Sequence, residues 1–558
     1  MKVVIIGGVA AGPKTAARLR RLMPDAEITV IEQGDVISYG SCGLPLYIGN
    51  LVPDIMDLMT TSSGSVRDRE FFADTKNVKV LNNTRAEAIN REKKSARIHN
   101  LISGQQEDFS YDYLVLATGA KPVVPNIPGK DLPGVFSLHH PQDAQAIREL
   151  VRVKKIKHVT IIGAGLIGME VADALAGPRL KVTICEALPQ ILPKLLDADM
   201  AAMVERQVRA KGVEIFLGSA VQSLIAGEDG AVAKVKTATG EIDTEAVILA
   251  IGMRPAVELA RDAGLSIGIT GAIKVNSQLQ TDDPYIYAGG DCVENLDLIT
   301  GEPIYSPLAS TANKHGRVIA NNIAGQTTVF PGVNKTSVLQ CFDYNIGRTG
   351  LGEDEAIHKG FETSTVLISG YDATHYFPMH DKVKVKLIAE KKSGKILGAQ
   401  VLGEGEVIKR LDVLVTAMKY GADLEDVASL DLGYAPPFST AIDLVAHAAN
   451  ALQNKIKGLV PSVSTQELMM MLQNKESFQF LDIRTWDEIQ NKPISYENKI
   501  EIPLNELNKR WPDLPANQKL ITVCELGIRG FEAACLLKGK GMSNVFFLEG
   551  GVSALASD

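Results

Sequence analysis

The sequence predicts an α/β protein built largely from parallel sheets, and three observations carry that prediction. Residues 2–6 form a short apolar run that is followed by a glycine-rich turn and a helical pattern over 14–23. The same order returns at 158–175, and a third strand–loop–helix pattern occupies 520–538. Short apolar runs that alternate with helical patterns are typical of parallel sheets covered by helices on both faces.

The composition limits the classes of function. The chain has 558 residues, of which 45% are hydrophobic and 22% are charged, as in an ordinary globular protein. A net charge of -8 without a long basic tract argues against nucleic acid or an anionic membrane as the main partner. We find no apolar run of 18 residues and no export signal, so we expect no membrane span and no secretion. Six scattered cysteines favour a reducing, cytoplasmic setting over a disulfide framework, and we expect no metal site.

The first glycine turn is an imperfect G-x-G-x-x-G fingerprint, the motif of Rossmann-like dinucleotide-binding domains. Gly7 and Gly12 match the motif, but Val9 occupies the second glycine position. The next strand, at 27–31, ends at Glu32, where an acidic side chain can accept hydrogen bonds from a ribose. The alternative is an ordinary glycine turn between a strand and a helix. The candidate nucleotide-binding residues are Gly7, Gly8, Ala10, Ala11, Gly12 and Glu32.

The second glycine turn is complete. Residues 163–168 read G-A-G-L-I-G between a strand and a helix, and the following strand ends at Glu186, 18 positions beyond Gly168. A carboxylate there would bond a free 2′-hydroxyl and repel a 2′-phosphate, so NADH is favoured. The nearby cations Arg179 and Lys181 keep NADPH possible. The candidate residues are Gly163, Gly165, Gly168 and Glu186.

Two further stretches resemble cofactor-contacting elements. Residues 111–129 predict a buried strand that ends in a turn of small residues, and 281–291 predict a strand that delivers Asp291 at a glycine turn. The pattern predicts a helix at 308–323. Small residues let the backbone approach a cofactor closely. The candidate residues are Ala117, Thr118, Gly119, Gly252, Gly290 and Asp291.

Cys42 is the candidate reactive atom of the N-terminal half. It lies in the sequence S-Y-G-S-C-G-L-P at 38–45, and the next cysteine is Cys185, so no local disulfide partner exists. If Cys42 does redox chemistry, its sulfur partner must come from a substrate. We expect a helix to begin near residue 44, and a helix N-terminus would lower the pKa of the thiol. The alternative is a small buried hydrophobic residue, as free cysteines often are.

The C-terminal part contains a second candidate cysteine. After a plausible linker, residues 462–558 form an independent α/β pattern that opens with a capping box at Ser464. Cys524 follows a strand directly and begins a loop that also contains Arg529 and runs into a helix. Several backbone N–H groups can converge on an anionic sulfur at such a place. The alternative is a buried cysteine at a strand end.

These motifs carry a family resemblance. Residues 1–452, with the single cysteine of S-Y-G-S-C-G-L-P, closely resemble the coenzyme A disulfide reductases and their relatives NADH oxidase and NADH peroxidase. Residues 462–558 resemble a rhodanese module through L-D-I-R at 481–484, C-E-L-G-I-R at 524–529 and the closing L-E-G-G-V-S. The resemblance implies the following domains: FAD-binding at 1–150 and 271–325, NAD-binding at 151–270, a homodimer-forming interface domain at 326–452, a linker at 453–461 and a rhodanese domain at 462–558.

The resemblance also implies an activity. Electrons would pass from NADH through FAD and Cys42 to a persulfide or polysulfide of coenzyme A, releasing hydrogen sulfide and thiol. Cys524, with Arg529 beside it, would carry sulfane sulfur. Tyr376 and Tyr434 match a pair placed near the substrate sulfur across the dimer, where Tyr434 would donate a proton. Residues that fall where the family contacts coenzyme A are Lys14, Arg18, Arg21, Ser38, Ser41 and Lys76, although the identities at 14, 18 and 41 vary.

Three alternatives remain open at this point. A coenzyme A disulfide reductase would use the same residues with another leaving group. A water- or peroxide-forming NADH oxidase or peroxidase would use a Cys42 sulfenate, but it does not explain the Cys524 loop. A sulfur-transferase or sulfur-trafficking scaffold would consume no NADH with any disulfide.

Overall fold

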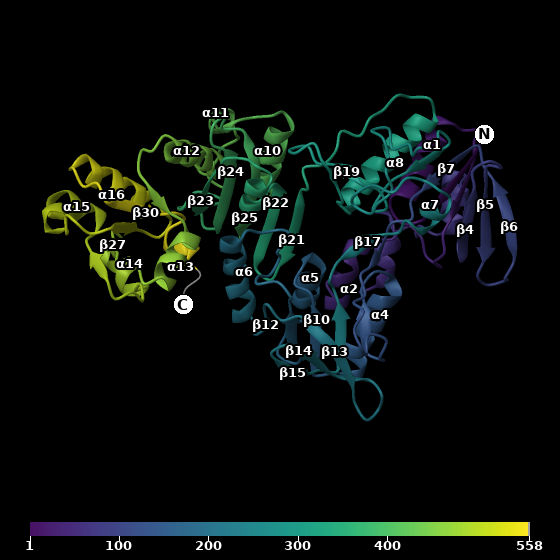
Figure 1. Ribbon diagram of the computed structural model, residues 1–558, viewed down its shortest axis with the longest axis horizontal. Coiled ribbons are helices and arrows are strands. Elements are labelled where there is room, and N and C mark those ends of the chain that lie inside the picture. The colour runs from purple at the N-terminus through teal and green to yellow at the C-terminus, as the bar shows by residue number, and fades with distance from the viewer. Residues whose placement is uncertain (556–558) are drawn as a thin grey trace. The chain divides into compact units, whose positions relative to one another are not determined.

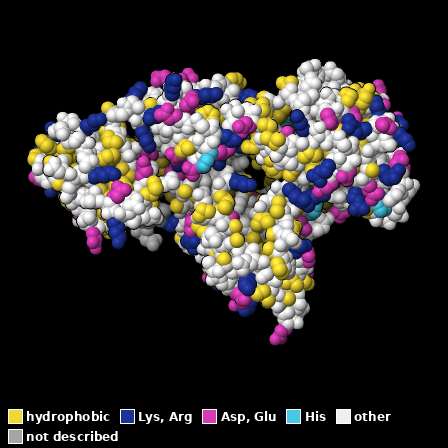
Figure 2. All heavy atoms as spheres, in the orientation of Figure 1, with side chains coloured by type: hydrophobic (Ala, Val, Ile, Leu, Met, Phe, Trp, Pro, Cys, Tyr) yellow, Lys and Arg dark blue, Asp and Glu magenta, His cyan; other side chains and the backbone are white. Residues whose placement is uncertain are grey.

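The computed structural model describes residues 1–555, and these form two compact units. One unit comprises Met1–Pro189 and Gly212–Val333, and the other comprises Gln190–Lys211 and the residues from Asn334 onward. Each unit contains two five-stranded sheets (Figure 1). On the face drawn in Figure 2, lysine and arginine side chains are interspersed with aspartate and glutamate. No helix within residues 1–555 is long and apolar enough to cross a membrane.

The first sheet is wholly parallel and is covered on both faces. Alternate residues of its central strand enter two separate cores, Val3 and Ile5 on one face and Val4 and Ile6 on the other. The continuous apolar run of the sequence therefore matches a doubly covered strand. The strand order is β18 (Ile286–Ala288), β7 (Tyr113–Leu116), β1 (Lys2–Ile6), β2 (Glu27–Ile31) and β3 (Lys79–Leu81), with helices α1 (Ala11–Leu22), α3 (Arg69–Lys76) and α8 (Ala309–Ile323) nearby in the same unit.

The second sheet of this unit repeats the same plan. All its strands are parallel, and helix α5 (Leu166–Leu175) follows its central strand as α1 follows β1. In chain order, α2 (Leu44–Gly49) and α4 (Pro141–Glu149) lie between α1 and α5. The order is β12 (Glu214–Phe216), β11 (Lys181–Cys185), β10 (His158–Ile162), β16 (Ala246–Leu249) and β9 (Val135–Ser137). The predicted α/β class with two Rossmann-like units is confirmed.

The second unit begins with an antiparallel sheet. Its order is β21 (Ser337–Cys341), β22 (Tyr344–Gly350), β25 (Ile396–Gly403), β24 (Lys382–Glu390) and β23 (Thr363–Tyr371), and helices α10 (Ile408–Lys419), α11 (Leu424–Ala428) and α12 (Leu444–Ile456) belong to the same region. Buried Lys386 on β24 binds three carboxylates, those of Asp197, Asp199 and Glu353, each at 3.0 Å. This cluster explains why α6 (Ala198–Ala210) groups with the antiparallel sheet although its sequence follows β11.

The C-terminal sheet is parallel. Its order is β26 (Ser462–Val463), β30 (Val545–Leu548), β29 (Leu520–Val523), β27 (Gln479–Asp482) and β28 (Lys499–Glu501). Figure 1 shows α13 (Thr465–Gln473) and α14 (Trp486–Asn491) on one side of it and α15 (Leu504–Arg510) and α16 (Ile528–Gly539) on the other. The predicted capping box is present, since the Ser464 hydroxyl accepts from the Glu467 amide.

The C-terminal domain is docked on the antiparallel sheet by Glu549. This side chain is 2% exposed and accepts hydrogen bonds from Lys455 Nζ at 2.6 Å and Ser462 Oγ at 2.5 Å. Its other oxygen accepts from the backbone N–H of Leu367 on β23 at 3.1 Å. The predicted linker is also shorter than its composition suggests, because α12 continues to Ile456.

Four small antiparallel features were not predicted. They are the sheet β4 (Thr84–Asn90), β5 (Ser95–Asn100) and β6 (Gln106–Ser110), the sheet β13 (Val221–Ala226), β14 (Val232–Thr237) and β15 (Gly240–Asp243), and the two-stranded pairs β17 (Met253–Pro255) with β8 (Ala120–Pro122) and β19 (Asn295–Leu296) with β20 (Pro303–Ile304). Their strands carry many polar residues, so their apolar alternation is weak in the sequence.

Candidate active site

The first glycine turn is closed against the neighbouring strand end. Gly7 has φ +115°, and a Cβ on it would lie 2.0 Å from the carbonyl oxygen of Ala117. A Cβ on Gly12 would lie 1.9 Å from the carbonyl oxygen of Gly7. The Glu32 carboxylate accepts from the amides of Gly8 at 2.7 Å and Gly34 at 2.8 Å. Both glycines are therefore required by close backbone packing at the start of α1.

The second glycine turn has the same construction. Gly163 has φ +106°, and a Cβ on Gly168 would lie 2.0 Å from the Gly163 carbonyl oxygen. The Glu186 carboxylate accepts from the amides of Ala164 at 2.7 Å and Leu188 at 2.9 Å. A Cβ on Gly165 would meet no atom within 4 Å, so the turn has open space where a pyrophosphate would lie at a helix N-terminus. The turn fits a dinucleotide.

Polar groups without partners mark the flavin-binding region. Asp291 makes no hydrogen bond or ion pair among residues 1–555, and burial raises its pKa to about 6. The buried hydroxyl of Tyr305 also makes no hydrogen bond within residues 1–555, and it lies within electrostatic reach of Asp291. The amide of Gly290 donates to His315 Nδ1 at 3.1 Å. A carboxylate left unpaired in this way suits a ligand hydroxyl, so these residues fit the flavin expected from the sequence.

The small-residue turn after β7 supports the same region. Thr118 Oγ1 donates to the Ala256 carbonyl at 2.7 Å, and Gly119 has φ +70° with open space beside it. Gly252 also has a positive φ, of +119°, and open space. On the other side, the methyl of Ala11 would lie 3.2 Å from a Cβ on Gly290, which brings the first glycine turn and the Asp291 turn together. Ala10 is the residue that precedes α1.

Cys42 lies where the sequence places it, but its predicted acidity is wrong. It sits in a 3-10 turn, Ser41–Gly43, directly before helix α2. The pKa of its thiol is raised, first by partial burial and then by the carboxylates of Glu170 and Asp291, while a hydrogen bond from Ser41 opposes the rise. Helix α2 has only six residues, so its dipole is too weak to outweigh desolvation and two negative charges.

Glu170 is a candidate functional residue that the sequence analysis missed. It lies on α5, two positions beyond Gly168, and burial raises its pKa to about 7. Its carboxylate is the largest charged influence on the Cys42 thiol. The only signal in the sequence is that Glu170 and Asp173 are carboxylates on an otherwise apolar helix, L-I-G-M-E-V-A-D-A-L. A group with a pKa near neutrality beside a reactive thiol is suited to holding or moving a proton.

The candidate coenzyme A residues lie mainly on α1. Lys14 and Arg21 are exposed, and Arg18 Nε donates to Asn321 Oδ1 at 3.0 Å. Lys76 ends α3, which Arg20 connects to α1 through the Lys76 carbonyl at 3.3 Å. Ser41 bonds the Cys42 thiol, and buried Ser38 adopts φ +52°. A cationic helix face of this kind is suited to the phosphates of coenzyme A.

Tyr376 and Tyr434 are brought together by their loops in the second unit. The two side chains interact, and the interaction with Tyr376 is the main cause of the raised pKa of Tyr434. Tyr376 is 63% exposed and Tyr434 is 49% exposed. Exposed tyrosines that face the same point are available to a ligand or to another protein chain.

Cys524 lies in a cradle of hydrogen-bond donors. Its Sγ accepts from the amides of Gly527 at 3.1 Å and Gly530 at 3.3 Å, and the charge of Arg529 lies within electrostatic reach of it. Gly527 has φ +95°, which turns its amide toward the sulfur and favours glycine. The residue is 1% exposed. Such a cradle stabilises an anionic sulfur, as expected from the sequence.

Arg529 has a second partner. Its two terminal nitrogens donate to the Glu488 carboxylate at 2.8 and 2.6 Å, and this pairing lowers the pKa of Glu488 to about 2. The bidentate bond fixes the guanidinium plane beside Cys524. Glu488 was not foreseen, because it lies on α14, far from Cys524 in the sequence.

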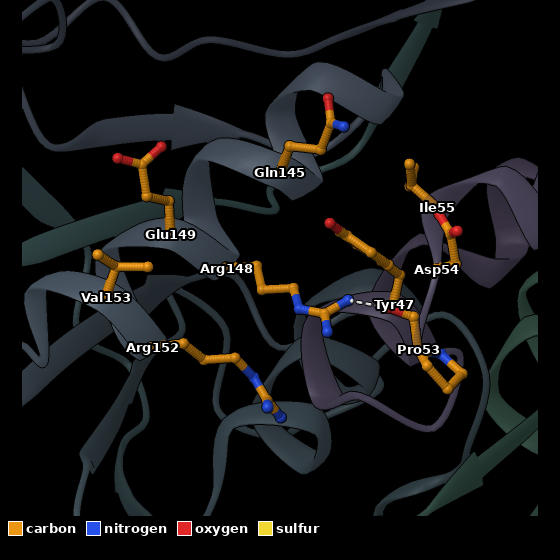
Figure 3. A pocket seen from close by; sticks show the side chains of 9 residues that line it. All are labelled: Tyr47, Pro53, Asp54, Ile55, Gln145, Arg148, Glu149, Arg152 and Val153. Atoms are coloured by element: carbon orange, nitrogen blue, oxygen red, sulfur yellow. Dashed lines mark hydrogen bonds between the residues drawn. The ribbon is translucent and has the colours of Figure 1, made fainter.

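A cavity of about 340 Å³ lies beyond the C-terminal end of α2 (Figure 3). Arg148 is its central side chain, and its guanidinium stacks 4.2 Å from the Tyr47 ring centre. The same group donates to the Pro53 carbonyl and to Asn50 Oδ1. These bonds occupy the arginine, and the carboxylates of Asp54 and Glu149 also line the cavity. The site is therefore not a cationic pocket that awaits an anion.

Comparison with known proteins agrees with this geometry. Residues 1–316 match the pyridine nucleotide-disulphide oxidoreductase family, 337–446 match its dimerisation domain and 464–558 match the rhodanese-like domain. A "NAD(P)H sulfur oxidoreductase (CoA-dependent)" of Pyrococcus furiosus is 36% identical over 452 residues, which are 81% of this chain and 99% of that protein. 

Two solved structures match nearly the whole chain. A NAD-dependent persulfide reductase from A. fulgidus is 41% identical, with a TM-score of 0.95, 99% of this chain and 100% of that chain covered. The reduced Bacillus anthracis CoADR-RHD is 36% identical, with a TM-score of 0.91 and coverages of 99% and 97%. The chain therefore belongs to the pyridine nucleotide-disulphide oxidoreductase family and ends in a rhodanese-like domain.

Proposed function

We propose that the chain is an NADH-dependent reductase of coenzyme A persulfide or polysulfide that releases hydrogen sulfide and free thiol. The observation that carries the proposal is the combination of one unpaired cysteine beside two nucleotide turns with a second cysteine in an anion-stabilising cradle. A sulfur carrier attached to a reductase suits a substrate that is itself sulfane sulfur.

The two nucleotide turns divide the cofactors between them. The first turn, with Asp291 across from it, would hold FAD, and the second, with Glu186, would hold NADH. FAD, when bound, supplies the two-electron link between the nicotinamide and sulfur. The carboxylate of Glu186 favours NADH, and Arg179 and Lys181 leave NADPH as a weaker substrate.

Cys42 would be the thiol that receives the substrate sulfur. Its thiolate attacks the outer sulfur of CoA–S–SH, the CoA thiolate leaves with the bonding electron pair, and Cys42–S–SH remains. Two electrons from NADH and two protons then convert Cys42–S–SH into the Cys42 thiol and hydrogen sulfide. Because the pKa of Cys42 is raised, the attack needs a proton acceptor, and of the two carboxylates in electrostatic reach, Glu170 and Asp291, we assign this role to Glu170, which acts more strongly on the thiol.

Coenzyme A and a second protomer would complete the site. We propose that the cationic α1 residues Lys14, Arg18 and Arg21 bind the phosphates of coenzyme A. The dimerisation domain supports a homodimer, in which the exposed pair of Tyr376 and Tyr434 would meet the substrate sulfur and protonate the leaving thiolate.

Anaerobic NADH oxidation with coenzyme A persulfide tests the proposal. We expect turnover in the wild type, its loss in Cys42→Ser, and its retention in Cys524→Ser with a defect confined to larger polysulfides. Unchanged turnover in Cys42→Ser would contradict the role of this thiol. Faster turnover with coenzyme A disulfide than with the persulfide would instead favour the disulfide reductase alternative.

A further inference from the structure

The antiparallel sheet contributes an unexplained lysine to the neighbourhood of Cys524. Lys384 on β24 is 5% exposed and makes no hydrogen bond or ion pair within residues 1–555. Burial, with the nearby cations Arg206 and Lys382, lowers its pKa to about 8. A buried amine without a partner is costly, and a protein that keeps one commonly uses it.

Lys384 lies beside the loop that carries Cys524. Residues 382, 384 and 386 alternate on one face of β24, and the ammonium of Lys382 is paired with the carboxylate of Glu525, the residue after Cys524. The charge of Glu525 also acts on Lys384. The lysines of one domain therefore face the sulfur-carrying loop of the other.

A second polar group without a partner lies at the same place. Ser369 pairs with Lys384 across strands β23 and β24, is 1% exposed, and its Oγ makes no hydrogen bond. A Cβ on Gly550 would lie 3.3 Å from that Oγ, and one on Gly551 would lie 2.5 Å from the Cys524 carbonyl oxygen. Gly550 and Gly551 thus lie between the unpaired hydroxyl of Ser369 and the backbone of Cys524.

We propose that Lys384, Lys382 and Ser369 form an inter-domain anion site that holds the negatively charged end of the sulfur donor of Cys524. The inference rests on the sulfur-carrying role proposed above. An acidic residue in the loop would by itself repel an anionic donor, and the Lys382–Glu525 pair cancels that charge. Lys384 and Arg206 then leave the site cationic, because Glu404 is the one other carboxylate within residues 1–555 that acts on Lys384. The rim side chains Lys382 and Arg529 remain 42% and 33% exposed, so an incoming donor meets them before the buried sulfur.

The transfer itself needs no external redox partner. The Cys524 thiolate attacks the outer sulfur of a donor R–S–SH, the R–S bond to that sulfur breaks, and R–S⁻ leaves with the electron pair. Cys524–S–SH forms, and cyanide can take the outer sulfur as thiocyanate and return the thiol. Any charged group on R stays at the anion site through this exchange.

The test compares donors with and without a carboxylate in this NADH-independent transfer to cyanide. N-acetylcysteine persulfide carries one carboxylate, and its methyl ester carries none. We expect kcat/KM for the acid to fall about tenfold in Lys384→Met and in Lys382→Gln, with the ester unchanged, since one charged contact is lost. Coenzyme A persulfide is the third donor. A larger loss of kcat/KM with it than with the acid in the lysine variants would show that the site recognises phosphates rather than carboxylates.

Two controls separate a binding role from a structural one. Lys392→Met removes an exposed lysine in the turn that follows β24 and should change nothing. In Lys382→Gln, adding Glu525→Gln should restore transfer from the acid, because the repelling charge is gone. Binding of N-acetylcysteine persulfide to Cys524→Ser, measured by calorimetry, should weaken about tenfold when Lys384→Met is added.

The contrary results are equally clear. Equal losses with acid and ester, or no loss in either lysine variant, would overturn the anion site while leaving the reductase proposal standing. If the wild type transferred sulfur from none of the three donors, the sulfur-carrying role of Cys524 and the anion site would both fall.

Discussion

Glu549 should control whether the rhodanese-like domain stays docked, and Glu549→Ala tests this. The substitution leaves the buried amide of Leu367 without its acceptor and removes the ion pair with Lys455. Breaking a buried pair costs about 3–5 kcal/mol. Lys455 is 28% exposed and can regain water, so we discount the loss to about 2–3 kcal/mol of docking free energy, which raises the undocked population about 30-fold to 150-fold.

Native-state trypsin cleavage measures that population. Lys457 follows α12 and is exposed, but the segment beyond it is held by Lys538, whose Nζ donates to the carbonyls of Gly458 and Leu459. Cleavage after Lys457 should therefore accelerate with undocking. Glu497→Ala, at an exposed glutamate of the same domain, serves as the control. A cleavage rate in Glu549→Ala within about threefold of the wild type would refute the assignment of docking to this carboxylate.

Three further predictions follow from the site. Glu170→Gln removes the largest charged influence on Cys42, so the midpoint of the pH profile for iodoacetamide labelling of Cys42 should move to lower pH; an unmoved profile would show that the two groups do not interact. Gly7→Ala places a methyl 2.0 Å from the Ala117 carbonyl oxygen, so the purified protein should lose FAD by absorbance ratio, whereas Gly539→Ala, which meets no atom within 4 Å, should keep it. The low pKa of Glu488, about 2, stabilises the folded state above its ordinary value of 4.5 and loses that contribution as pH falls from 4.5 toward 2. The melting temperature of Glu488→Gln should accordingly lie below that of the wild type at neutral pH and converge with it in acid; a constant difference would contradict the pairing with Arg529.

The sequence was sufficient for features that depend on neighbours along the chain. Both glycine turns, the strands before them and the acidic residues after them lie where the spacing predicts, because a parallel strand–turn–helix unit is a local structure. The Cys524 cradle was predictable for the same reason, since its donors come from the six residues that follow the sulfur.

What the sequence did not predict depends on residues far apart in the chain. The pKa of Cys42 was expected to be low from the helix beside it, but Glu170 and Asp291 reach it from more than 100 positions away. Likewise, the docking carboxylate of Glu549 and the unpartnered amine of Lys384 have no meaning until β23, β24 and the closing loop of the last domain are brought together.

Mass spectrometry of Cys42 tests the central claim most directly. After anaerobic mixing with coenzyme A persulfide, we expect one added sulfur on Cys42, and NADH should remove it with release of one hydrogen sulfide per site. Protein alkylated at Cys42 should neither gain the sulfur nor oxidise NADH. Full turnover by the alkylated protein would contradict the account.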